Sequence, residues 1–281
     1  MQTVTNGDIT LATETFGTPS DGPAVLLVMG ATASMLSWPD AFCQALAEAG
    51  LFVIRFDHRD TGQSTARPFG TTSDTVEDLV TDVFAIAEAY GLSRYHLVGM
   101  SLGGYITQMI ASDPPPQLAS ITLIASEPLG WDGAELPTLP PEFFAHVGGL
   151  ADLDWSNRAE VIDFLVEITR LSTGTAPYDP AAARADVERL VEYAPNVASM
   201  FNHASLTTRE DWTGAYARIK VPTLVVHGAL DPLLPLPNGE ALAGHIAGAR
   251  LVVLPNTGHE LPPHALPILT EAIAAHVKAT D

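Results

Sequence analysis

The sequence has 281 residues, of which 47% are hydrophobic and 16% are charged, a composition typical of a folded globular protein. That length suffices for one α/β domain with an insertion or for two small domains. The net charge of −20 argues against a nucleic-acid partner and an anionic membrane surface, because both carry negative charge. A single cysteine, Cys43, excludes an intramolecular disulfide and a metal site built from several cysteines.

The amino-terminal stretch MQTVTNGDIT lacks the basic start and the apolar run of a secretory signal, so we expect a cytoplasmic protein. A long uncharged run, residues 23–39, holds Gly, Ser, Thr and Pro in its second half. This pattern favours a buried strand that leads into a loop over a membrane-spanning helix. No membrane partner is therefore predicted.

Short apolar runs recur along the chain and predict strands that are buried on both faces, as in a covered parallel sheet. These runs are residues 24–30, 51–57, 95–100, 118–126, 222–228 and 249–256. Helical patterns separate them, over residues 38–49 and 74–90, directly after Ser101, and over residues 263–279. The alternation predicts a doubly wound α/β fold with a mostly parallel sheet.

The strand rhythm is interrupted between residues 128 and 215, where the sequence indicates helices and loops. An insertion between two strands of such a sheet lies at its carboxyl edge, where α/β folds bind ligands. We therefore predict a core of residues 1–127 and 216–281 and a helical cap of residues 128–215. The alternative is a second helical layer that covers no pocket.

Ser101 lies between a predicted strand and a predicted helix, in the pattern Gly99-Met100-Ser101-Leu102-Gly103. A G-x-S-x-G turn in this context holds a nucleophilic serine on a strained backbone, and its small neighbours prevent clashes. The turn also directs the positive end of the helix at the same point. The alternative is that Ser101 only caps the helix.

A serine hydroxyl needs a base, and the partners of such a serine follow it in the order acid, then histidine. Asp231 follows the strand PTLVVHG, and His259 follows the strand ARLVVLPN. We predict that His259 takes the Ser101 proton while Asp231 orients the imidazole. Asp231 could instead be a turn residue and His259 a surface residue, and Glu127, after another strand, is an alternative acid.

Acyl transfer also requires hydrogen-bond donors for the oxyanion that develops on the substrate. The backbone N–H of Leu102, directly after the nucleophile, is one predicted donor. The second is the N–H of Ala31 in the loop after the strand AVLLVMG, where Gly30 permits the sharp exit of the chain. Both donors are backbone groups, so no side-chain deletion removes them.

Several apolar and aromatic residues on the entrance loops and the predicted cap are candidates to line a substrate pocket, although they could equally be core. The candidates for substrate binding are Met29, Gly30, Trp38, Phe143, Phe144, Phe201 and His203, of which His203 could also be an ordinary cap histidine. His58, Arg59 and Asp60 are expected to hold the neighbouring loop. No histidine and carboxylate spacing predicts a metal, and no glycine-rich phosphate loop predicts a nucleotide cofactor.

These motifs resemble the α/β-hydrolase superfamily over essentially the whole chain. The stretches LLVMGATASMLSWP (26–39) and VIRFDHRDTGQST (53–65), with HGALDPLLP and PNTGHELP, resemble the aclacinomycin methylesterase group of anthracycline-tailoring enzymes. The resemblance implies a triad of Ser101, Asp231 and His259, with Ala31 and Leu102 as the oxyanion donors. The family carries Gly-Gly or His-Gly at the oxyanion loop, whereas this chain has Gly30-Ala31, which keeps the backbone donor and adds a methyl group.

The predicted function is a serine hydrolase that cleaves a small-molecule carboxylic ester without a cofactor, as a monomer or homodimer. Lactonase, amidase, thioesterase, carbon–carbon hydrolase and perhydrolase activities use the same triad and stay open as alternatives. A small-molecule receptor with this fold and negligible turnover is the alternative from another class. Dehalogenases and epoxide hydrolases of this architecture use an aspartate nucleophile, which Ser101 argues against.

Overall fold

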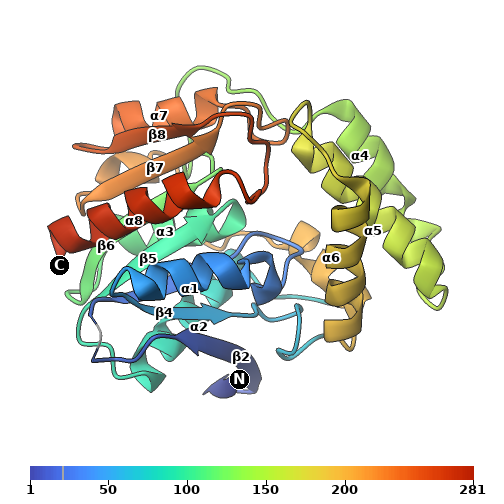
Figure 1. Cartoon of the computed structure of the whole chain (residues 1–281), viewed down its shortest axis with the longest axis horizontal. Helices are drawn as coiled ribbons and strands as arrows, with labels where there is room; N and C mark the ends of the chain where they lie inside the picture. The colour runs from blue at the N-terminus through green and yellow to red at the C-terminus, as the bar shows by residue number, and fades with distance from the viewer. Residues whose placement is uncertain (21) are drawn as a thin grey trace.

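The computed structural model describes residues 1–20 and 22–281, and its centre is an eight-stranded sheet in the order β1-β2-β4-β3-β5-β6-β7-β8 (Figure 1). β3 to β8 run parallel, whereas β2 is antiparallel to both β1 and β4. The strands are β1 (Gln2–Asn6), β2 (Ile9–Phe16), β3 (Ala24–Val28), β4 (Phe52–Phe56), β5 (Tyr95–Met100), β6 (Leu118–Ile124), β7 (Thr223–Gly228) and β8 (Arg250–Leu254).

Helices flank the sheet on both faces, as predicted for a doubly wound fold. The α-helices are α1 (Asp40–Glu48), α2 (Val76–Ala89), α3 (Leu102–Ser112), α4 (Pro141–Val147), α5 (Arg158–Thr173), α6 (Pro180–Tyr193), α7 (Pro237–His245) and α8 (Leu266–Thr280). Short 3₁₀ segments are η1 (Met35–Ser37), η2 (Gly148–Ala151), η3 (Val197–Ser205) and η4 (Ala215–Arg218). No helix among the described residues is both long and apolar enough to cross a membrane.

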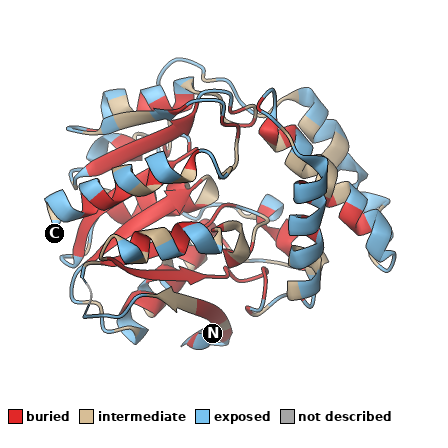
Figure 2. Cartoon of the chain, in the orientation of Figure 1, coloured by how far each residue is buried: buried red, intermediate tan, exposed pale blue. Residues whose placement is uncertain are grey.

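Alternate residues of each central strand point to opposite faces, and each face buries its own apolar cluster. On β3, Leu26 and Val28 pack in the cluster that includes residues of α2, α3 and α7. Val25 and Leu27 pack in the other cluster, with residues of α1 and α8. Figure 2 shows the central strands as buried from end to end, which explains their apolar sequences.

The parallel strands end at one edge of the sheet, and this edge collects the predicted catalytic residues. Val28 pairs with Gly99, Met100 with Ile124, and Gly228 with Leu254. The segments that follow β3, β5, β6, β7 and β8 therefore leave the sheet side by side at its carboxyl edge, as in other α/β folds. The six strands predicted from the sequence are confirmed within a few residues at each end.

Residues 128–215, called the insertion below, leave the sheet after β6 and return before β7. The insertion contains α4, η2, α5, α6 and η3, and Figure 1 shows its three α-helices together at one end of the sheet. It has an apolar cluster of its own, which includes Leu165, Val187 and Phe201. The insertion therefore packs partly on itself, apart from the two clusters that cover the sheet.

Candidate active site

Ser101 lies between the last residue of β5 and the first residue of α3, on a strained backbone. Its φ of 53° and ψ of −118° are rare for a residue with a side chain. The Ser101 N–H donates to the Ile124 carbonyl, and its carbonyl accepts from Ser126 Oγ at 3.1 Å. Its side chain caps no helix N–H, and among the described residues its Oγ forms no hydrogen bond, so the hydroxyl is uncommitted.

The glycines around Ser101 are required because backbone segments approach each other closely there. A Cβ on Gly103 would lie 1.9 Å from the Val28 carbonyl oxygen, and one on Gly99 would lie 2.2 Å from the Gly103 oxygen. A Cβ on Gly30 would lie 3.2 Å from Ser101 Cβ. The G-x-S-x-G pattern is thus a packing requirement, and it brings the loop after β3 against the serine.

His259 and Asp231 are hydrogen-bonded to each other, with His259 Nδ1 lying 2.8 Å from Asp231 Oδ2. Asp231 follows β7 and His259 follows β8, and these strands are neighbours in the sheet. The Asp231 side chain is fully buried, whereas the His259 side chain retains 11% of its exposure. Nδ1 therefore donates to the carboxylate, which leaves Nε2 without a proton in the neutral ring.

The second oxygen of Asp231 is fixed by the backbone. Oδ1 accepts hydrogen bonds from the N–H groups of Leu233 and Leu234, both at 2.9 Å. His227 Nε2, on β7, donates to the Leu234 carbonyl and lies 3.6 Å from Asp231 Oδ2. The Asp231 carboxylate is therefore held in one orientation. Burial lowers the pKa of the adjacent His227, which keeps that imidazole neutral.

The two backbone groups predicted to bind an oxyanion come from segments on either side of Ser101. Leu102 is the first residue of α3, and the first N–H groups of a helix have no acceptor within the helix. Ala31 follows Gly30, which lies against the Ser101 side chain. The next residue, Thr32, has a φ of 57°, so the loop after β3 turns sharply at this point.

The insertion contacts the carboxyl edge of the sheet at two places that the sequence did not predict. The Ser172 carbonyl, at the end of α5, accepts a hydrogen bond from the His259 N–H at 2.8 Å. A Cβ on Gly258 would clash with the Ser172 and Thr173 carbonyl oxygens, so α5 ends directly on the histidine loop. At the other contact, His203 Nδ1 lies 3.2 Å from the Thr32 N. Each contact has a backbone group as one or both partners, so no pair of side chains in the sequence indicates it.

The residues proposed from sequence to bind substrate occupy contrasting positions. Trp38 is fully buried against Phe42 in the core cluster beside α1, and Met29 is buried in the same cluster. Phe201 is buried in the cluster of the insertion. Phe144 is 58% exposed on α4, and Phe143 beside it is half-buried. His203 is buried with both ring nitrogens engaged, and Gly30 touches Ser101.

Glu127, the alternative acid, follows β6 and is exposed. Its backbone carbonyl accepts from Gln108 Nε2 at 2.9 Å. The carboxylate that meets the His259 imidazole is that of Asp231. His58, Arg59 and Asp60 are all buried after β4, and Arg59 forms an ion pair with Asp82 at 2.8 Å, a contact that fixes this loop on α2.

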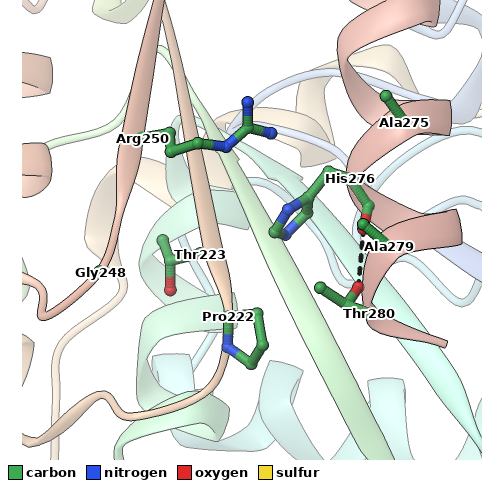
Figure 3. A pocket seen from close by; sticks show the side chains of 8 residues that line it. All are labelled: Pro222, Thr223, Gly248, Arg250, Ala275, His276, Ala279 and Thr280. Atoms are coloured by element: carbon green, nitrogen blue, oxygen red, sulfur yellow. Dashed lines mark hydrogen bonds between the residues drawn. The ribbon is translucent and has the colours of Figure 1, made fainter.

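A cavity of ≈ 380 Å³ lies elsewhere, at the opposite edge of the sheet (Figure 3). Thr223 and Arg250, which line it, are the first residues of β7 and β8, and His276 and Thr280 reach it from α8. Ser101, Asp231 and His259 follow the last residues of their strands. This cavity therefore belongs to the amino edge and is separate from the candidate active site.

The chain belongs to the alpha/beta hydrolase fold family, which matches residues 23–263. It is 34% identical to rhodomycin D methylesterase DauP from Streptomyces sp. (strain C5), over 98% of this chain and 97% of the relative. Rhodomycin D methylesterase DnrP from Streptomyces peucetius is 32% identical over the same shares. The enol-lactonase from Burkholderia xenovorans LB400 has the same fold, with a TM-score of 0.77, 21% identity, and coverage of 99% of this chain and 100% of that chain. The predicted family and its resemblance to a methylesterase group are confirmed.

Proposed function

We propose that this protein hydrolyses a small-molecule carboxylic ester through an acyl-enzyme on Ser101. His259 is the general base and acid, Asp231 orients it, and the Ala31 and Leu102 N–H groups bind the oxyanion. The two methylesterases, each matched over nearly its whole length, support a methyl ester as the substrate. No cofactor enters the proposed reaction.

The observation that carries this proposal is the arrangement at the carboxyl edge of the sheet. A strained serine with an uncommitted hydroxyl directly precedes α3, and the hydrogen-bonded Asp231–His259 pair follows the neighbouring β7 and β8. Because Asp231 holds the Nδ1 proton of the neutral imidazole, Nε2 is free to accept the serine proton. This division of roles is what acyl transfer requires.

In the proposed reaction, Ser101 Oγ attacks the ester carbonyl while its proton passes to His259 Nε2. The carbonyl oxygen becomes an oxyanion, stabilised by two N–H groups whose positions are set before substrate arrives. His259 then protonates the leaving alcohol, which departs and leaves the acyl group on Ser101. Water, deprotonated by His259, attacks the acyl-enzyme and releases the carboxylic acid.

Residues 1–127 and 216–281 form the catalytic core in this proposal, and the insertion, residues 128–215, acts as a cap that selects the substrate. The insertion supports this role because it contacts both the histidine loop and the loop after β3. Among the aromatic residues proposed from sequence, the half-buried Phe143 and the exposed Phe144 on α4 remain available to a substrate.

The test is a burst assay with p-nitrophenyl esters of graded acyl length, run beside methanol release from methyl esters of polycyclic aromatic acids. We expect wild-type protein to release p-nitrophenol in a burst, and Ser101→Ala to release none. A fluorophosphonate probe should label wild-type protein once, on Ser101. Glu127→Gln is the control, because it changes a carboxyl at the same edge and leaves the proposed triad intact.

Wild-type protein that hydrolyses no ester and is not labelled by the probe would overturn the proposal in favour of a receptor. Turnover of cyclic esters alone would move the substrate class to lactones. Retention of activity in Ser101→Ala would show that the serine is not the nucleophile.

A further inference from the structure

Two buried histidines bond the loop after β3 at two points. His58 Nε2 lies 2.9 Å from the Met29 carbonyl oxygen, and His203 Nδ1 lies 3.2 Å from the Thr32 backbone N. Met29 O belongs to the peptide group before the Gly30–Ala31 peptide, and Thr32 N belongs to the one after it. The peptide that carries the Ala31 N–H is therefore flanked on both sides by a peptide group anchored to an imidazole.

The partners of each ring fix which nitrogen carries the proton. A carbonyl oxygen only accepts, so His58 Nε2 donates to Met29 O and His203 Nε2 donates to the Arg59 carbonyl at 2.9 Å. His203 Nδ1 is then a lone pair, which accepts the Thr32 N–H. The rings meet edge to face with centroids 5.9 Å apart, and burial lowers the pKa of both, so both are neutral.

The backbone of Thr32 needs such an anchor. Its φ of 57° is unfavourable for a β-branched residue and persists only where the surroundings impose it. Thr32 Oγ1 donates to the Ala31 carbonyl, a contact within the loop that ties it to nothing else. The bond from Thr32 N to His203 is the tie that connects this turn to the insertion.

The segment that carries His203 is itself fixed to the core. On η3, Ser199 Oγ donates to the Asp60 carbonyl at 2.8 Å, and Asn202 Oδ1 accepts from the Gly70 N–H at 2.8 Å. The imidazole therefore projects from a segment that is also bonded at Asp60 and Gly70 to the loop after β4. Because this segment is fixed, the His203 side chain can determine where the Thr32 N–H lies.

We propose that His203 is a positioning residue for catalysis. From its position in the insertion, it accepts a hydrogen bond from the Thr32 N–H and so holds the Ala31 N–H toward the oxyanion. This inference rests on the proposed function, since Ala31 is a donor only if Ser101 forms a tetrahedral adduct. It assigns the insertion a part in transition-state binding in addition to substrate selection. His203 itself touches no reacting atom.

The test compares His203→Phe, which keeps a ring but lacks the acceptor, with His203→Gln, whose amide can accept from Thr32 and donate to Arg59. The matched control is His146→Phe, because His146 is another histidine of the insertion, which stacks on Phe164 and donates to a backbone carbonyl. We expect His203→Phe to lower kcat by about 100-fold with little change in KM, the cost of a misplaced catalytic group. A boronic acid that forms a tetrahedral adduct on Ser101 should lose affinity by the same factor.

His203→Gln should restore most of the lost kcat, and His146→Phe should leave kcat unchanged. Hydrogen–deuterium exchange should show faster exchange in residues 30–34 of His203→Phe, and this readout does not depend on activity. Wild-type kcat in His203→Phe, an equal loss in His146→Phe, or unchanged exchange at residues 30–34 would each overturn the inference. If wild-type protein is inactive, the proposed function fails, while the exchange experiment still decides whether His203 holds the loop.

Discussion

His259 and Asp231 lie 28 positions apart in the sequence, yet His259 Nδ1 and Asp231 Oδ2 are 2.8 Å apart. The contact exists because β7 and β8 are adjacent and parallel, so that the loops after them meet. The other carboxylate oxygen is committed to two backbone N–H groups. The pair therefore has a defined polarity. Oδ1 of Asp231 accepts from the backbone, and Oδ2 accepts from the imidazole of His259.

That polarity predicts the effect of Asp231→Asn. The amide oxygen would take the position that faces the Leu233 and Leu234 N–H groups, which places its NH₂ group against His259 Nδ1. The imidazole would then carry its proton on Nε2 and could not accept the serine proton. We expect kcat to fall by about 10⁴-fold, as for the same change in other triads.

The measurement for Asp231→Asn is steady-state hydrolysis of the best p-nitrophenyl ester found for wild-type protein. Glu127→Gln, measured beside it, should keep kcat near wild type. A large loss in Glu127→Gln with a small loss in Asp231→Asn would assign the acid to Glu127.

The strained backbone at Ser101 predicts a gain in stability when the side chain is removed. A φ of 53° suits glycine, so Ser101→Gly should raise the free energy of unfolding by about 1 kcal/mol. Ser101→Ala keeps the Cβ and should leave the free energy of unfolding near wild type. Urea denaturation monitored by circular dichroism measures both, and a destabilised Ser101→Gly would show that the turn is not strained.

The close approach of β3 to α3 predicts that Gly103→Ala is severe. Its Cβ would come within 1.9 Å of the Val28 carbonyl oxygen, and a backbone oxygen at the centre of the sheet cannot move aside cheaply. We expect the free energy of unfolding to fall by about 1–3 kcal/mol or more, as in overpacked cores. Gly244→Ala on α7 is the control, because nothing lies within 4 Å of its Cβ position.

Thermal melting with and without Gly103→Ala tests this expectation. Gly244→Ala should raise the melting temperature, since alanine is favoured over glycine inside a helix. Equal melting temperatures for wild type and Gly103→Ala would mean that the β3–α3 packing is looser than described.

Burial of His58 predicts that the protein loses stability as the pH falls. Burial lowers the pKa of His58 from 6.5 to about 3, so the folded state holds the neutral ring while the unfolded chain binds a proton below pH 6.5. The stabilising contribution is complete above about pH 6.5 and is lost between pH 6.5 and 3. At pH 5 the loss from this residue is about 2 kcal/mol relative to neutral pH.

Urea denaturation of wild type and His58→Gln at pH 7 and pH 5 measures this contribution. The variant should show the smaller change between the two pH values, whatever its stability at pH 7. His264→Gln, at an exposed histidine, is the control. An identical pH dependence in wild type and His58→Gln would mean that His58 is protonated in the folded state.

The sequence was sufficient for the parallel part of the sheet because β3 to β7 are apolar on both faces, a pattern that few other structures produce. It was insufficient for β1, where Val4 is the one buried residue, and for β2, where threonines interrupt the apolar residues at the antiparallel edge. Short apolar runs indicate buried strands, so they do not reveal a half-exposed hairpin at the edge of a sheet. Helix α7 was missed as well, because residues 237–245 lack an apolar stripe.

At the candidate site, the order of Ser101, Asp231 and His259 was readable because each follows a strand. The contacts of His203 and Ser172 could not be predicted, since each depends on where the insertion meets the core. Aromatic side chains also misled in part: Trp38 has the character of a pocket residue, yet it is fully buried against Phe42. Side-chain chemistry indicates what a residue could do, whereas packing decides what it touches.

The hydrogen bond from the His259 N–H to the Ser172 carbonyl limits how this protein can be redesigned. The last turn of α5 supports the histidine loop, so an exchange of the insertion for that of a relative also replaces the support of His259, the proposed base. A chimera joined outside residues 128–215 would change the proposed cap and the position of His259 at once. Joining the chains so that Ser172 to Gly174 stay native would let the cap vary while His259 keeps its position.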